Sequence, residues 1–70
     1  MRDEILLEYE KQIRENKETI ESFTSATDQM KKGLNFMSAI KTMNELKELS
    51  DQREVLLNGL LEYIVANYSD

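Results

Sequence analysis

The stretch that decides the fold is Lys31-Lys32-Gly33-Leu34-Asn35, near the middle of the 70-residue chain. Its two lysines suit the end of a helix, where the helix dipole favours cations. Gly33 fits a residue that must take the left-handed conformation after a helix, and Leu34 fits the apolar residue that folds back behind it. Asn35 or Ser38 suits the cap of a following helix. The stretch therefore predicts a tight turn between two helices.

Mostly apolar residues are spaced alternately by three and four positions on both sides of this turn. Before it they are Leu6, Tyr9, Ile13, Asn16, Ile20, Phe23, Thr27 and Met30. After it they are Ala39, Thr42, Leu46, Leu49, Arg53, Leu56, Leu60 and Tyr63. A repeat of 3.5 residues keeps one face turned toward a partner helix. We expect a single all-α domain over residues 1–70, an antiparallel, coiled-coil-like two-helix hairpin with helices over about 3–32 and 36–68 and a turn at 33–35.

One stretch of the second helix leaves an alternative open. Asp51 and Glu54 match a capping box just before an apolar run, which is typical of a helix start. A break near residue 50 would give three helices instead of two.

The residue types present argue against catalysis. The chain has no cysteine and no histidine, so it lacks disulfides, the usual zinc ligands and the usual general base near neutral pH. Its two glycines are isolated and form no phosphate-binding loop. Glu15, Glu18 and Glu21 repeat every three residues, but they lie off the heptad positions and suit a solvated face. We expect no enzyme activity, no cofactor and no metal.

Charge separates the two ends of the predicted hairpin. The chain has a net charge of −5, which disfavours binding to nucleic acid or to an anionic membrane. Residues 31–47 carry four bases and one acid, whereas residues 1–30 and 48–70 are each net negative. The turn end is therefore positive and the open end negative. No apolar run approaches a membrane span and the first residues do not resemble a signal peptide, so we expect a cytoplasmic location without membrane insertion.

A polar layer interrupts the heptads in each helix. Asn16 falls opposite Arg53 when the chain folds back, between apolar layers. A buried polar layer can fix the register of a coiled coil at a cost in stability. Alternatively, the contact opens to water there and Arg53 extends outward.

Near the C-terminus the chain has more apolar residues than one helix contact needs. A helix that is apolar on more than one side is buried on more than one side. We expect these residues to bind another helical protein or a second copy of the chain. The candidate partner-binding residues are Ile5, Leu7, Val55, Leu57, Gly59, Leu61, Ile64, Val65 and Tyr68.

The chain resembles the small co-chaperones of type III secretion needle subunits. The similar features are Met30-Lys31-Lys32-Gly33 at the turn and Leu60-Leu61-Glu62-Tyr63-Ile64-Val65 near the end. The resemblance implies a cytoplasmic helical hairpin that docks on a helical-repeat chaperone and, with it, holds the needle subunit.

These observations predict a protein-binding adaptor or co-chaperone that buries its apolar C-terminal helix face against a helical partner. A chain this short buries little core, so association is expected. The alternative is a structural or regulatory homo-oligomer, such as two hairpins forming a four-helix bundle.

Overall fold

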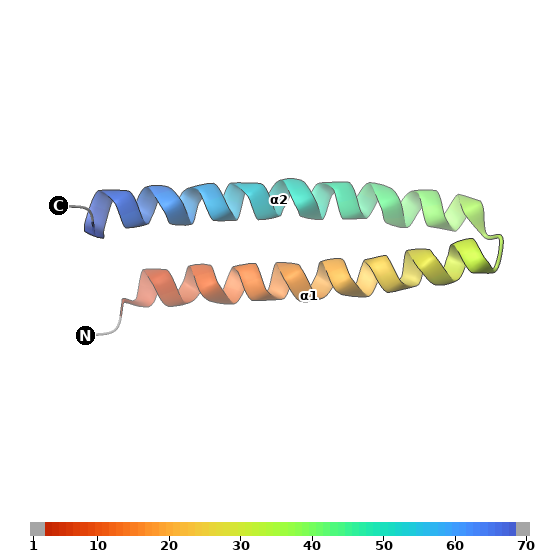
Figure 1. Ribbon diagram of the computed structural model, residues 1–70, viewed down its shortest axis with the longest axis horizontal. Helices are drawn as coiled ribbons and strands as arrows, with labels where there is room; N and C mark the ends of the chain where they lie inside the picture. The colour runs from red at the N-terminus through yellow and green to blue at the C-terminus, as the bar shows by residue number, and fades with distance from the viewer. Residues whose placement is uncertain (1–2, 69–70) are drawn as a thin grey trace.

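The computed structural model describes residues 3–68 and shows two antiparallel helices. Helix α1 spans Glu4–Lys32 and helix α2 spans Phe36–Tyr68, and the start of α1 lies at the same end of the rod as the end of α2 (Figure 1). The rod measures 54 × 18 × 12 Å. The predicted all-α hairpin is confirmed. Because α2 runs unbroken through Ser50 and Asp51, the three-helix alternative is wrong.

Each helix begins at a side-chain cap. The carboxylate Oδ1 of Asp3 accepts hydrogen bonds from the backbone N–H groups of Ile5 at 3.0 Å and Leu6 at 3.2 Å. The side-chain oxygen of Asn35 accepts from the N–H of Ser38 at 3.4 Å, so Asn35 is the cap of α2. Such caps satisfy N–H groups that have no partner within the helix.

The turn between the helices differs from the prediction in one residue. Gly33 has φ −82°, whereas Leu34 has φ 62° and takes the left-handed conformation. The N–H of Leu34 donates to the carbonyl of Lys31, and the N–H of Asn35 donates to that of Met30 at 2.8 Å. This is the hydrogen-bond pattern of a Schellman motif with Leu34 at its left-handed position. The helix ends at Lys32, as predicted, but the left-handed residue lies one position later than predicted, and a leucine carries the strain.

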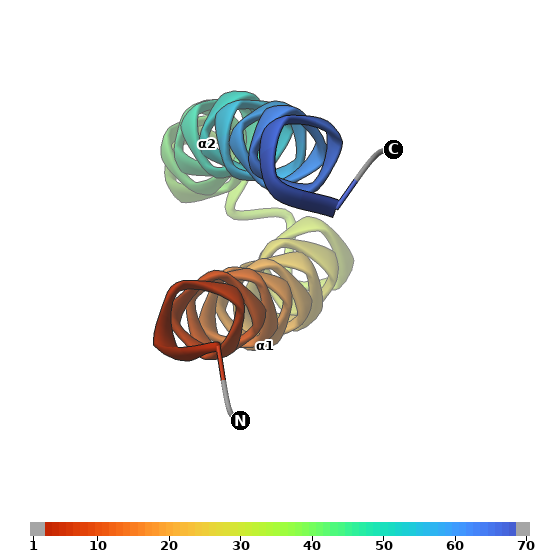
Figure 2. The same cartoon turned by 90° about the vertical axis from the view of Figure 1, so that its left-hand side faces the viewer.

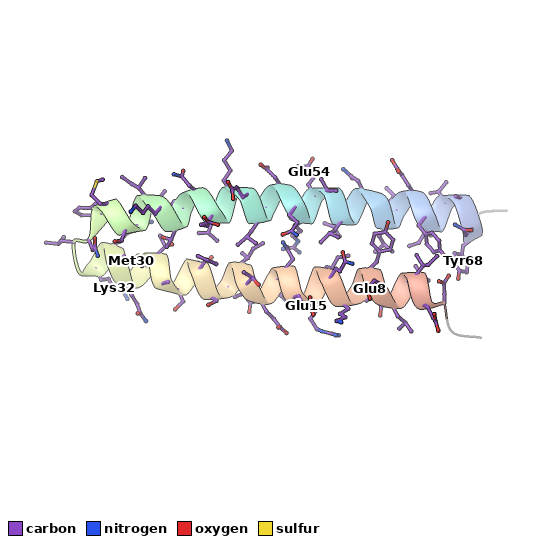
Figure 3. All side chains as sticks on the ribbon, turned by 180° about the vertical axis from the view of Figure 1, so that it is seen from behind. Glu8, Glu15, Met30, Lys32, Glu54 and Tyr68 are labelled. Carbon is purple, nitrogen blue, oxygen red and sulfur yellow. The ribbon has the colours of Figure 1, made fainter. Side chains whose placement is uncertain are left out.

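The heptad positions form the contact between the helices, which we call the first seam. All eight in α1 are buried or half-buried, and so are all in α2 except Arg53. In Figure 2 the helices lean in opposite directions along their length, and in Figure 3 side chains fill the space between them. Only Ala39, Thr27 and Asn16 are buried among the described residues, so most of the seam is only partly shielded from solvent.

Small residues make the part of the first seam nearest the turn. Thr27 is 3% exposed and Ala39 is 2% exposed. The hydroxyls of Thr27 and Thr42 lie 2.6 Å apart across the seam, and each also lies within hydrogen-bond distance of a carbonyl on its own helix. A hydroxyl carries a single proton, so two of these three hydrogen bonds form at one time. These short side chains let the helices approach closely.

The polar layer at Asn16 forms with a different partner from the one predicted. Asn16 is buried, and its Nδ2 donates to the carbonyl of Leu49 at 3.0 Å and to Oε1 of Gln52 at 3.4 Å. Arg53, which one interpretation placed in a buried layer with Asn16 and the alternative extended outward, is exposed. Seven-residue spacing placed Arg53 at the seam, but its long charged side chain keeps its charge in water. The buried Oδ1 of Asn16 has no hydrogen-bond partner among residues 3–68.

Candidate protein-binding site

Aromatic rings shape the open end of the hairpin. The rings of Tyr9 on α1 and Tyr63 on α2 lie with centroids 6.3 Å apart, and those of Tyr63 and Tyr68 lie 6.4 Å apart, nearly edge to face. A Cβ at Gly59 would lie 2.9 Å from the hydroxyl of Tyr9 and 3.3 Å from a carbon of its ring. Gly59 lies within helix α2, and its lack of a side chain leaves room for Tyr9. Its Cβ direction faces α1 of its own chain.

Asp3 ties the open end together. Its Oδ2 accepts hydrogen bonds from the hydroxyls of Tyr63 at 2.8 Å and Tyr68 at 2.5 Å, while its Oδ1 caps α1. Figure 3 shows Tyr68 at the end of α2, turned toward α1. One carboxylate thus joins the first turn of α1 to the last two turns of α2. We call Asp3, Tyr63 and Tyr68 the terminal clamp.

The terminal clamp shifts the ionisation of its members. Hydrogen bonds from Tyr68 and then Tyr63 lower the pKa of the Asp3 carboxyl below its ordinary 3.8, because they favour the charged form. The same bonds to Asp3, with burial, raise the pKa of Tyr63 from 10.0 to about 12 and raise the pKa of Tyr68. The clamp is therefore complete across the neutral range.

An apolar groove lies beside the first seam at the open end. It has a volume of about 480 Å³ and an apolar floor formed by Ile5, Tyr9, Val55, Leu56 and Gly59. Glu4, Glu8 and Gln12 complete its lining. A second, more polar pocket of about 300 Å³ adjoins it at the shared residues Gln12 and Leu56 and reaches Thr19 and Gln52. We call the first part the Gly59 groove.

The structure divides the predicted partner-binding residues between two sides of the hairpin. Ile5, Val55 and Gly59 line the Gly59 groove. Leu57, Leu61, Ile64 and Tyr68 are exposed and follow one another by three or four residues on another side of α2. Leu7 lies one turn after Asp3, and Val65 lies on the outer side of α2; both are exposed. The predicted surface is thus two surfaces, and the tyrosine that shapes one of them, Tyr9, was assigned to the seam alone.

A second group of exposed apolar residues lies at the turn end and was missing from the sequence prediction. They are Leu34, Phe36, Met37, Ile40 and Met43. The prediction relied on the density of apolar residues, which is highest near the C-terminus. The spacing of Phe36, Ile40 and Met43, which continues that of Leu57 and Leu61, was the available signal.

The described residues hold no group of three or more acidic, histidine or cysteine side chains placed to bind a metal ion. Glu15, Glu18 and Glu21 are exposed. Over residues 3–68, neither helix combines the length and the apolar character that crossing a membrane requires. In comparisons with known proteins, no family model, no curated protein and no solved structure matches this chain.

Proposed function

We propose that the chain is a protein-binding adaptor that holds a helix of another protein in the Gly59 groove. The observation that carries the proposal is that the apolar floor of this groove stays exposed although α1 and α2 are packed against each other. Val55 is 71% exposed and Ile5 is 51% exposed at this floor. Covering apolar surface of this kind is the main driving force of protein association.

The shape of the groove favours a helix over a compact small molecule. With its polar continuation, the groove follows α1 from Glu4 to Thr19, which is about 22 Å at 1.5 Å per residue. An amphipathic helix places side chains into such a groove at every third or fourth position.

The charge at the Gly59 groove indicates which kind of partner helix would bind there. Glu4 and Glu8 stand at the groove, in an end of the hairpin that is net negative. A partner with lysine or arginine beside its apolar anchors would complement these carboxylates, and an acidic partner would be repelled. The resemblance to needle-subunit co-chaperones gives the narrowest form of the proposal: a cytoplasmic role in type III secretion, with a helical-repeat chaperone as the partner.

The test uses a synthetic 18-residue helical peptide with leucines along one face and lysines beside them. The chain has two glycines, at opposite ends of the hairpin, so their amide NMR signals report on each end separately. We expect saturable shifts of the Gly59 amide and none of Gly33. A peptide with glutamate in place of lysine is the charge control and should bind more weakly.

Two matched variants locate the peptide. Val55 and Leu57 are two residues apart and therefore lie on opposite sides of α2, about 200° apart. Val55→Asp should abolish the shift of Gly59, and Leu57→Asp should leave it. An unmoved Gly59 in the unmodified chain, or equal shifts in both variants, would overturn the proposal.

A further inference from the structure

Helix α2 carries a second row of residues with the alternating spacing of a helix contact. Eight of its ten members follow a residue of the first seam by one position. We call this row the second stripe: Phe36, Ile40, Met43, Lys47, Ser50, Glu54, Leu57, Leu61, Ile64 and Tyr68.

Apart from Tyr68, whose hydroxyl bonds to Asp3, the second stripe lies to one side of the contact with α1. Its seven apolar members are between 39% and 60% exposed. One residue turns the helix by about 100°, so the stripe lies at about a right angle to the first seam. Neighbouring helices of a four-helix bundle meet a given helix in this relation. One side of α2 is thus covered by α1. The second stripe, which lies at the angle where a bundle places another helix, is not covered by any helix of the described residues.

The stripe is complementary to itself when one copy is reversed. In an antiparallel pair of α2 helices, each stripe residue lies opposite the residue of the second copy whose number, added to its own, gives 104. Ile40 then meets Ile64 of the second copy, and Met43 meets Leu61 of the second copy. Phe36 at the start of the helix meets Tyr68 of the second copy at its end. A two-fold dimer requires a surface of this self-complementary kind.

Polar and charged residues favour the reversed orientation over the parallel one. Lys47 lies opposite Leu57 of the second copy, one turn from Glu54 of the second copy, so its stem can cover the leucine while its ammonium group approaches the carboxylate. Reversal also places the net positive turn end, residues 31–47, on the net negative open end. A parallel arrangement would place like charges together.

We propose that a second copy of this chain packs antiparallel on the second stripe, giving a two-fold four-helix bundle centred between Ser50 and Glu54. The two copies of α2 form the apolar contact. The Gly59 groove lies on the other side of α2 and stays open in the dimer. The dimer and the adaptor function therefore use different surfaces, and an experiment that contradicts one leaves the other untouched.

Disulfide mapping tests the register. The chain has no cysteine of its own, so Ile40→Cys combined with Ile64→Cys introduces the only thiols. Within one chain these positions are about 36 Å apart and cannot be joined. After mild oxidation with glutathione disulfide, we expect a covalent dimer whose peptides join position 40 to position 64. Lys41→Cys with Glu62→Cys, on another side of the helix, is the control.

Two results of this mapping would overturn the proposal. Links that join 40 to 40 and 64 to 64 would show a parallel pair. A yield of dimer no higher than that of the control would show that the stripe is not a contact.

A second measurement separates the contact from the fold. In sedimentation equilibrium we expect the unmodified chain at twice its mass of 8.2 kDa. Met43→Asp, on the stripe, should give a monomer that keeps its helical circular dichroism. Met37→Asp, beside the stripe at a residue that is 73% exposed, should stay dimeric. A monomeric unmodified chain, or the same mass for both variants, would contradict the proposal.

Discussion

The two rows of α2, the first seam and the second stripe, share the same spacing and lie one residue apart around the helix. In the first seam, Leu46, Leu49 and Leu56 are half-buried against α1. In the second stripe, Leu57 and Leu61 are 43% and 60% exposed. The chemistry of the leucines is the same, and what differs is whether a helix lies opposite. A hairpin can supply a helix to one row only, so the other row is available for association.

The two rows also differ in where their polar residues lie. The first seam has Thr27 and Thr42 near the turn and Asn16 toward the middle, each hydrogen-bonded across the helices. The second stripe has its polar residues, Lys47, Ser50 and Glu54, at its centre, with apolar residues at both ends. A polar layer at one end only, such as the threonine pair near the turn, fixes the order of two different helices. A polar centre with apolar ends suits two identical helices that run in opposite directions.

The largest expected effect separates the two rows directly. Leu49→Ala in the first seam should lower the free energy of unfolding by about 2 kcal/mol, at every protein concentration. Leu61→Ala in the second stripe should lower the melting temperature only at concentrations where the unmodified chain is dimeric. Thermal melts followed by circular dichroism across a hundredfold dilution series measure both. A concentration-independent loss for Leu61→Ala would contradict the separation of the two rows.

Asn16→Leu should strengthen the first seam. The buried Oδ1 of Asn16 has no hydrogen-bond partner in the described part of the chain, and the flanking seam residues are Ile13 and Ile20. Removing an unpaired buried oxygen and filling its place with an apolar side chain should raise the free energy of unfolding by about 1–2 kcal/mol. Chemical denaturation measures the change. Lys17→Leu is the control, since Lys17 is exposed and lies outside the first seam, so this variant should gain little. A loss of stability in Asn16→Leu would show that its hydrogen bonds outweigh the unpaired oxygen.

The turn that brings the first seam together should improve when its leucine is removed. Leu34 is left-handed and 72% exposed, so Leu34→Gly should relieve strain at little cost in packing and add about 1 kcal/mol. Gly33→Ala is the matched test at the neighbouring position. Its added Cβ would lie 3.5 Å from the nearest carbonyl oxygen, and its φ suits alanine, so this variant should be tolerated. Denaturation that shows Gly33→Ala to be the damaging change would place the left-handed residue at Gly33.

The smallest effect is a pH dependence at the terminal clamp. Because the pKa of Asp3 is lowered on folding, its contribution is present above 3.8 and is lost as the pH falls below that value. Because the pKa of Tyr63 is raised, its contribution is present below pH 10.0 and is lost as the pH rises toward 12. Asp3→Asn keeps a cap for α1, so the helix should remain. In this variant the melting temperature should fall less at both acid and alkaline pH than it does in the unmodified chain. Glu18→Gln, far from the clamp, should leave the profile as it is.

The hairpin was predictable from the sequence because two signals agree. The spacing of the seam residues predicts two facing helices, and the residue types around Asn35 predict a turn between them. The left-handed residue was misplaced because glycine is the usual choice there, and the hydrogen bonds of Leu34 and Asn35 decide it only in three dimensions. Arg53 occupied a correct heptad position, but spacing does not account for the preference of its charge for water. Gln52, one residue earlier, made the contact instead.

The candidate surface was predictable in part. The surplus of apolar residues near the C-terminus was visible in the sequence. Its division between the Gly59 groove and the second stripe depended on where Tyr9 lies. Because the ring of Tyr9 approaches Gly59, one part of that surplus becomes the floor of a groove. The row that joins Leu57 and Leu61 to Phe36 and Ile40 was visible in the spacing, but the prediction followed the density of apolar residues near the C-terminus and missed it.

The most direct test of the second stripe is a nuclear Overhauser effect between two methyl groups. The chain has five isoleucines, so selective labelling gives a simple spectrum. Ile40 and Ile64 are about 36 Å apart along α2, too far for any signal within one chain. A cross-peak between their δ-methyl groups, lost on dilution, is the predicted result. A well-resolved spectrum at high concentration without that cross-peak would contradict the account.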